Sequence, residues 1–282
     1  MVKLVECPRD AMQGWPKLIP TEKKIRYINA LLQVGFNTID FGSYVSPKAI
    51  PQMADTAEVL EGLELTADGS KLLAIVANER GASQALLSDK ISYLGFPFSV
   101  SETFQQRNTN STMSGSLERV EEIQNLCIKN GRELVVYISM GFGNPYGDPY
   151  SEEFVFDWVN RLAEREIRII SLSDTIGLAT PEQVKRMTSY LVDVLPDLEI
   201  GVHLHSKPGN WQSKLESVLD SGCRRIDGAL KGIGGCPMAG DELVGNMDTE
   251  MMAGYLLERN FNTGLDMKAL LHCSMLANEV FV

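Results

Sequence analysis

The chain has 282 residues, of which 44% are hydrophobic and 22% are charged, and its net charge at pH 7 is −11. These proportions exclude an intrinsically disordered chain, and the acidic balance excludes a general nucleic-acid-binding protein, which needs a basic face to neutralise phosphates. No uninterrupted apolar run reaches the roughly 20 residues of a membrane span.

Short apolar segments recur along the chain and predict eight β-strands. These strands are expected over 2–6, 36–41, 72–77, 91–96, 134–139, 167–172, 199–204 and 224–230. Each segment is almost continuously apolar or β-branched. Such composition is typical of strands that are buried on both faces of a parallel sheet.

Longer segments with helical periodicity separate the strands. We predict helices over 21–34, 116–130, 151–165, 180–195, 210–221, 248–258 and 266–278. Thr180 is a typical capping residue, Pro181 follows it at the first helical position, and Gly131 follows the end of an earlier helix.

Eight strands alternate with helices, and no linker rich in Pro, Gly or Ser separates them. This pattern predicts an α/β fold. We expect a (β/α)8 TIM barrel that forms a single domain over 1–282. The alternative is a doubly wound open sheet. No GxGxxG motif opens the turn after the first strand, which weakens the dinucleotide-binding form of that alternative.

Polar side chains able to do chemistry follow the ends of the predicted strands, where a barrel carries its active site. They are Arg9, Asp10 and Gln13 after the first strand, Asp40 and Ser43 after the second, Glu102 and Asn108 after the fourth, Asp174 and Thr175 after the sixth, His203 and His205 at the end of the seventh, and Cys236 and Asn246 after the eighth. Helix capping, an exposed ion pair or loop solvation would explain each one singly. Their gathering at one end predicts an active site there.

Two of the three histidines in the chain, His203 and His205, are separated by one residue. Residues i and i+2 of a strand point to the same side, so both imidazoles would face the barrel mouth. Together with a carboxylate such as Asp10 they predict a site for a divalent metal. The alternative is a pair of hydrogen-bonded polar residues that end a buried strand.

Cys236 stands in a glycine-rich loop, 232–237, after the last predicted strand. The loop is either a tight turn that needs positive φ or a mobile loop that carries a thiol over the site. The other four cysteines lie in apolar or helical segments, and the chain has no CxxC pair. We therefore expect reduced thiols and a cytoplasmic protein, and the segment 1–6 (MVKLVE) predicts a strand rather than a targeting peptide.

Several motifs together resemble the 3-hydroxy-3-methylglutaryl-CoA lyase family. They are Arg9-Asp10 with Gln13, 43–48 (SYVSPK), 51–53 (PQM), 101–104 (SETF) with Asn108, 173–177 (SDTIG), 202–205 (VHLH) and 234–237 (GGCP). The likeness runs in order from about residue 2 to about residue 270. The Ser-Pro-Lys and Gly-Gly-Cys-Pro segments are specific to the lyase, whereas the Arg-Asp and His-x-His parts occur in a wider superfamily of metal-dependent barrels.

The resemblance implies a (β/α)8 barrel that uses Mg²⁺ or Mn²⁺ to cleave an acyl-CoA substrate, 3-hydroxy-3-methylglutaryl-CoA, into acetyl-CoA and acetoacetate. It implies catalytic roles for Arg9, Asp10, Asp40, His203 and Cys236. It further implies the metal ligands Asp10, His203, His205 and Asn246, and the substrate-binding residues Gln13, Ser43, Asp174 and Thr175. A homodimer is expected from the same resemblance.

The chain departs from the family's pattern at several positions. Asp40 stands where the family has a catalytic glutamate, and Phe41 and Gly42 replace small hydroxyl residues. Trp15 replaces an acidic residue, Ser206 replaces an aspartate, and one extra residue separates Cys236 from Asn246. We expect these changes to surround the substrate region, so that the reaction type is better determined than the exact substrate.

Three other functions are alternatives to the lyase. The first is a condensing acyl-CoA enzyme of the isopropylmalate or homocitrate synthase type, which usually has an additional C-terminal domain that 282 residues leave no room for. The second is a 4-hydroxy-2-oxo acid aldolase, and the third is a catalytically silent barrel used for binding.

Overall fold

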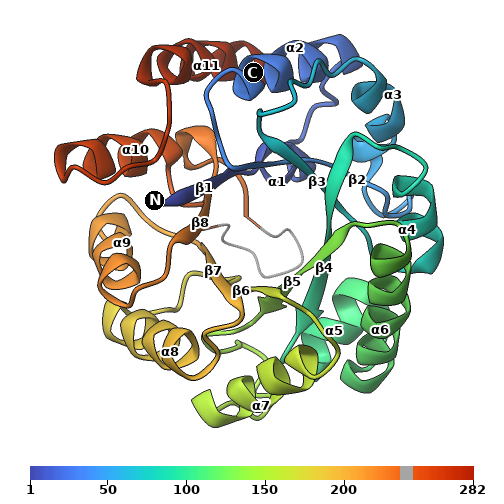
Figure 1. Ribbon diagram of the computed structural model, residues 1–282, viewed down its shortest axis with the longest axis vertical. Coiled ribbons are helices and arrows are strands. Elements are labelled where there is room, and N and C mark those ends of the chain that lie inside the picture. The colour runs from blue at the N-terminus through green and yellow to red at the C-terminus, as the bar shows by residue number, and fades with distance from the viewer. Residues whose placement is uncertain (236–243) are drawn as a thin grey trace.

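A computed structural model of the chain describes residues 1–235 and 244–282. Eight parallel strands form a closed barrel in chain order, with β8 paired to β1 (Figure 1). The strands are β1 (Lys3–Glu6), β2 (Thr38–Ser43), β3 (Lys71–Ile75), β4 (Ile91–Ser99), β5 (Glu133–Ser139), β6 (Ile169–Asp174), β7 (Glu199–Leu204) and β8 (Arg225–Gly228). The predicted TIM barrel is confirmed, and the open-sheet alternative is excluded.

Helices surround the barrel (Figure 1). They are α1 (Pro8–Gln13), α2 (Thr21–Leu32), α3 (Thr56–Glu61), α4 (Glu79–Ala85), α5 (Glu102–Thr109), α6 (Met113–Lys129), α7 (Glu152–Ala163), α8 (Pro181–Val194), α9 (Trp211–Asp220), α10 (Thr249–Glu258) and α11 (Met267–Val280), with 3-10 turns η1 (Pro51–Met53) and η2 (Leu230–Gly232). The seven predicted helices all exist. The helices α1, α3, α4 and α5 were not predicted, because they have six to eight residues and show too few turns for a clear period.

Several strands end later than predicted, because polar residues at their ends still pair with the neighbouring strand. Ser173 and Asp174 extend β6 by pairing with His203 and Leu204 of β7. The last strand is shorter than the predicted 224–230, because the 3-10 turn η2 begins at Leu230.

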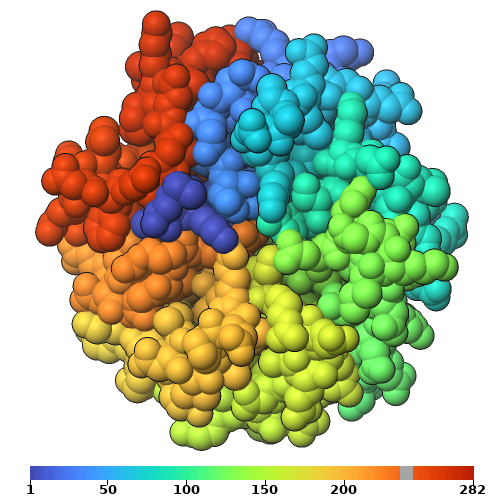
Figure 2. Space-filling view, in the orientation of Figure 1, coloured from blue at the N-terminus to red at the C-terminus, as the bar shows by residue number. Residues whose placement is uncertain are grey.

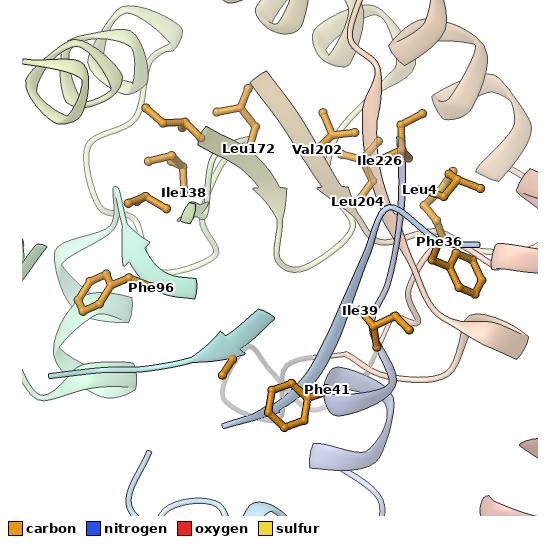
Figure 3. Packing of buried hydrophobic residues seen from close by; sticks show 14 of the residues in the cluster. Leu4, Phe36, Ile39, Phe41, Phe96, Ile138, Leu172, Val202, Leu204 and Ile226 are labelled. Carbon is orange, nitrogen blue, oxygen red and sulfur yellow. The ribbon is translucent and has the colours of Figure 1, made fainter. Parts of the chain in front are cut away.

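The main hydrophobic core lies between the strands and the ring of helices. Side chains on the outer faces of the strands, such as Leu172, Val202 and Ile226, belong to this core (Figure 3). Phe41 and Ile39 of β2 also belong to it and are at most 2% exposed. Successive residues of a strand therefore alternate between two cores, one outside the barrel and a smaller one inside it.

The inside of the barrel is filled by alternate residues of the strands. A second apolar cluster consists of Leu73, Ile75, Tyr93, Val135, Tyr137 and Ile169. At the amino ends of the strands, Glu199 of β7 pairs with Lys3 and Arg225. Figure 2 shows the face that carries the N-terminus, where the dark-blue N-terminal residues pack against orange residues of the C-terminal third. None of the described helices is long and apolar enough to cross a membrane.

Candidate active site

A cavity of about 390 Å³ opens at the carboxyl ends of the strands. Its walls come from the ends of β1 to β7 and from the loops and helix α5 that follow them. The polar lining residues are Arg9, Asp10, Gln13, Arg107, Asn108, Thr109, Tyr137, Ser139, Ser173, Thr175, His203 and His205. The sequence placed the site at this end of the barrel, and the structure gathers most of the predicted residues there.

The guanidinium of Arg9 is held by three side chains. Arg9 stands in the first turn of α1, directly after β1, and its Nε and Nη2 donate to both carboxylate oxygens of Asp40 at 2.5 to 3.2 Å. Its Nη1 donates to Asp10 Oδ1 at 3.0 Å and to Gln13 Oε1 at 2.9 Å. These bonds fix a cation at the wall of the cavity, where such a group can stabilise a developing negative charge.

The two carboxyls beside Arg9 differ in pKa. Asp40 is 1% exposed, and burial raises its pKa to about 6 although Arg9 acts in the opposite direction. For Asp10, burial is the largest influence and raises the pKa, but the charges of Arg9 and His203 outweigh it and hold the pKa well below its usual value. Asp10 is therefore a carboxylate at neutral pH and is available as an anionic ligand.

Asp10, His203 and His205 each offer one ligand atom, and these atoms lie within 4.8 Å of one another. Asn246 joins them: its Nδ2 donates to Asp10 Oδ2 at 2.8 Å and to the carbonyl of Ile233 at 2.9 Å. Backbone pairing between His205 and Asn246 ties the segment after β8 to the end of β7. We call Asp10, His203, His205 and Asn246 the upper donor group.

The upper donor group fits a divalent cation. Among the described residues, Asn246 Oδ1 and His205 Nδ1 are buried without a hydrogen-bond partner, which is costly unless a ligand occupies them. One carboxylate, one amide oxygen and two imidazoles suit a cation such as Mg²⁺ or Mn²⁺ better than a thiophilic metal. Burial and the neighbouring His203 lower the pKa of His205 to about 4, so its imidazole is neutral at pH 7 and can offer a lone pair.

His203 is oriented from behind by Asp227 of β8. His203 Nδ1 lies 3.2 Å from Asp227 Oδ2, and the Asp227 side chain is completely buried. A carboxylate on one ring nitrogen is the usual arrangement for a metal-binding histidine, because it fixes the tautomer and frees the other nitrogen. Burial lowers the pKa of His203, but the bond and charge of Asp227 raise it overall.

The predicted substrate-binding residues fall into two pairs. Gln13 and Thr175 line the cavity, and Thr175 Oγ1 also accepts a bond from the Met140 amide at 2.8 Å. Ser43 and Asp174 are 2% and 1% exposed and are absent from the cavity lining.

Asp174 forms a buried ion pair with Lys214 of α9. Lys214 Nζ donates to Asp174 Oδ2 at 2.7 Å and to the carbonyl of His205 at 2.8 Å. The two side chains are 1% and 0% exposed, and Asp174 Oδ1 accepts the Ala179 amide. The pair therefore ties the ends of β6 and β7 to a helix directly behind the upper donor group.

Of the positions that depart from the family pattern, Asp40 holds Arg9 at the cavity wall, whereas Phe41 and Trp15 lie elsewhere. Phe41 belongs to the core outside the barrel, and Trp15 packs edge-on against Phe281 at 5.2 Å between ring centroids. Neither is among the residues that line the cavity, so for these two positions the expectation that they surround the substrate region is wrong. Cys236 lies outside the described residues.

Sequence reasoning missed Asp227, Tyr137 and Lys214. Asp227 and Tyr137 occupy inward positions of their strands, so the period of two could have found them. Lys214 stands next to Leu215 and one turn before Val218 on the buried face of α9, and a charge on an apolar helix face is the signal that could have found it.

Comparison with known proteins decides the family. The model of the HMGL-like family matches residues 2–276. The chain belongs to the HMGL-like family. It is 33% identical over 273 residues to human cytoplasmic 3-hydroxy-3-methylglutaryl-CoA lyase, covering 94% of this chain and 71% of that protein. It is also 33% identical over 272 residues to a hydroxymethylglutaryl-CoA lyase of Bacillus subtilis, covering 96% and 90%.

Solved structures of HMG-CoA lyases have the same fold as this chain. An HMG-CoA lyase from Acinetobacter baumannii, in complex with coenzyme A and 3-methylmalate, has a TM-score of 0.92 at 32% identity and covers all of this chain and 91% of its own. The Bacillus subtilis HMG-CoA lyase also gives 0.92 at 32% identity, with 99% and 93% covered. The carboxyl transferase domain of Rhizobium etli pyruvate carboxylase, at 15% identity and 0.71, shares the fold alone.

Proposed function

We propose that this chain is a divalent-metal-dependent carbon–carbon lyase that cleaves 3-hydroxy-3-methylglutaryl-CoA into acetyl-CoA and acetoacetate, with residues 1–282 acting as one lyase domain. The observation that carries the proposal is the arrangement at the cavity wall. Arg9, fixed by Asp40, stands beside Asp10, which is shared with the upper donor group. A fixed cation and a metal site next to each other suit a reaction that develops an enolate.

Asp10, His203, His205 and Asn246 would hold Mg²⁺ or Mn²⁺. When bound, the metal supplies a Lewis acid that lowers the pKa of a substrate hydroxyl and orients the substrate. The fit rests on the unpartnered, buried Asn246 Oδ1 and His205 Nδ1 and on the donor chemistry of the group.

The reaction is a retro-aldol (Claisen-type) cleavage of a tertiary alcohol. The hydroxyl proton leaves to Asp10 or His203 as the carbon–carbon bond breaks, the hydroxyl oxygen becomes the ketone of acetoacetate, and the bond's electron pair stays on the thioester enolate. The guanidinium of Arg9 stabilises that enolate, and Asp40 positions the guanidinium. Cys236 donates the proton that converts the enolate to acetyl-CoA, and Gln13, Ser43, Asp174 and Thr175 bind or position the substrate.

The acyl-CoA substrate is supported by the Acinetobacter baumannii relative, whose structure holds coenzyme A. We further propose a homodimer in the cytoplasm. Cys7, Cys127, Cys223 and Cys273 are free and buried, in keeping with a reducing compartment.

Product analysis tests the proposal. The purified chain is incubated with 3-hydroxy-3-methylglutaryl-CoA and Mg²⁺ or Mn²⁺, and acetoacetate and acetyl-CoA are measured. Formation of both products, with loss on chelation, supports the lyase. Condensation of an acyl-CoA with a 2-oxo acid, or cleavage of a 4-hydroxy-2-oxo acid, would instead favour the alternative enzymes, and binding without turnover would favour a silent barrel.

Two variants test the assigned residues. Cys236→Ser should lower kcat by about 10²- to 10⁴-fold, the usual share of a proton donor, and should leave metal affinity unchanged. His203→Ala should weaken the binding of Mn²⁺ measured by calorimetry. Near-normal turnover of the first variant, or unchanged metal affinity of the second, contradicts the corresponding role.

A further inference from the structure

A second group of ligand atoms lies inside the barrel and shares His203 with the upper donor group. Cys7, His203 and Asp227 each contribute one ligand atom, and these three atoms lie within 4.8 Å of one another. We call these three residues the lower donor group. Cys7 directly follows β1, His203 belongs to β7 and Asp227 belongs to β8, and these three strands are neighbours in the closed barrel.

The strand period brings the three side chains together. Val5 pairs with Asp227 in the register of β1 and β8, and Cys7 is two residues further along the chain from Val5. His203 is two residues after Gly201, which pairs with Arg225. Because residues two apart point to the same side, these positions all face the barrel interior. Cys7 and Asp227 are 0% and 1% exposed.

The lower donor group contains polar atoms that the described residues do not satisfy. Asp227 Oδ1 is buried without a hydrogen-bond partner, although Oδ2 lies 3.2 Å from His203 Nδ1. The only hydrogen bond described for the Cys7 thiol is a long one, 3.9 Å to the carbonyl of Val5. The hydroxyl of Tyr137, whose ring packs edge-on against His203 at 6.0 Å between centroids, also has no partner among the described residues. An unpaired carboxylate oxygen in the dry interior is costly, and a cation would offset that cost.

The donor chemistry distinguishes the two groups. The upper donor group offers oxygen and imidazole ligands, which suit Mg²⁺ or Mn²⁺, whereas the lower donor group combines a thiol, an imidazole and a carboxylate. Zn²⁺, Co²⁺ and Cd²⁺ prefer such a set and accept four-coordinate geometry in a confined space. We propose that Cys7, His203 and Asp227 form a second metal site, specific for thiophilic divalent cations, beneath the catalytic site.

The two sites exclude each other because a neutral imidazole has one lone pair. With Nδ1–H facing Asp227, the lone pair is on Nε2 and serves the upper donor group. A cation in the lower site takes the Nδ1 lone pair, so the ring proton moves to Nε2. The Cys7 thiol loses its proton to solvent and binds as thiolate. Zn²⁺ in the lower site therefore removes His203 from the upper donor group and inhibits the enzyme, a consequence that rests on the proposed function.

Cobalt absorption tests the site itself without an activity measurement. Apo-protein carrying Cys236→Ser, which removes the thiol outside the described residues, is titrated with Co²⁺. We expect a thiolate-to-cobalt charge-transfer band in the near ultraviolet that saturates with one bound ion. The band should disappear in Cys7→Ser and remain in Cys127→Ser. Cys127 is a matched control, because it is a buried thiol whose raised pKa has burial as its sole cause. The band should also remain in Asp10→Asn, which removes a carboxylate from the upper donor group and none from the lower donor group.

A charge-transfer band that persists in Cys7→Ser, or bound Co²⁺ with no such band, overturns the proposal. Should Cys7→Ser fail to fold by circular dichroism, Cys7→Ala and Asp227→Asn give the same readout. Inhibition is measured separately with Cys236 intact and Mn²⁺ held constant. The half-inhibitory concentration of Zn²⁺ should rise at least tenfold in Cys7→Ser and stay unchanged in Cys127→Ser. Absence of lyase turnover would contradict the proposed function but would leave the cobalt result as the test of the site.

Discussion

The buried pair between Lys214 and Asp174 gives the sharpest stability prediction. Both side chains are essentially unexposed, and Lys214 Nζ lies 2.7 Å from Asp174 Oδ2 and 2.8 Å from the carbonyl of His205. Removing one partner leaves an uncompensated charge in the interior, which costs about 3–5 kcal/mol. We therefore expect Lys214→Met to lower the free energy of unfolding in urea by about that amount and the midpoint of thermal unfolding by roughly 6–20 °C.

The double variant Lys214→Met/Asp174→Asn separates the contribution of the ion pair to stability from the contribution of side-chain packing. It removes both charges, and the introduced amide side chain keeps an oxygen that can accept from the Ala179 amide, as Asp174 does. We expect it to be more stable than Lys214→Met alone, with a coupling energy of about 2 kcal/mol. The exposed pair between Lys185 and Asp220, at 52% and 62% exposure and 2.9 Å, is a matched control. Lys185→Met should change stability by at most about 1 kcal/mol.

A small effect of Lys214→Met, within about 1 kcal/mol of the Lys185→Met control, would refute this reasoning. It would mean that the pair is not closed to water as the structure describes it. A large loss of stability with no recovery in the double variant would assign the effect to packing of the lysine stem instead of charge.

Three further predictions concern Glu6, Gly234 and Arg9. Burial raises the pKa of Glu6 to about 8 from 4.5, so the folded state keeps a proton that the unfolded state has lost, and stability falls as pH rises from 4.5 to 8. The free energy of unfolding should fall by up to about 5 kcal/mol over this range. Glu6→Gln should remove this part of the pH dependence, measured by urea unfolding at pH 5 and at pH 8. An unchanged pH dependence in Glu6→Gln contradicts the assignment. A Cβ at Gly234 would collide with Asn246 Nδ2, so Gly234→Ala should weaken Mn²⁺ binding about 10- to 100-fold in calorimetry. Gly131→Ala, also at positive φ but in open space, should leave Mn²⁺ affinity unchanged, and equal effects of the two would refute the steric cause. Arg9→Lys cannot make the paired bonds to Asp40 and should lower kcat by about 10²- to 10³-fold at saturating metal, whereas a rise in KM alone would show that Arg9 acts in binding.

Much of the site was predictable because a parallel barrel collects the residues after its strands at one end. The sequence therefore located Arg9, Asp10, His203, His205 and Asn246 from strand ends and motifs. It could not show that Ser43 and Asp174 are outside the cavity lining, because the exposure of these strand-end residues depends on which other elements cover them. It also placed Phe41 near the substrate, whereas the period of two turns that side chain outward into the core.

The order and nature of the strands and helices follow from local patterns, and so does the barrel, because eight buried strands alternating with helices have few other ways to bury both sheet faces. Partnerships between distant residues follow only from the tertiary structure. Lys214 and Asp174 are 40 residues apart, and Cys7 lies about 200 residues before His203 and Asp227 in the sequence. Closure of β8 onto β1 brings those last three together, and no local pattern specifies it. The net charge of −11 and the five cysteines exclude whole classes of protein. They do not show what surrounds any one charged side chain or thiol. Only the packing decides that Arg9 is a held cation beside the upper donor group and that Cys7 faces an imidazole and an unpaired carboxylate oxygen.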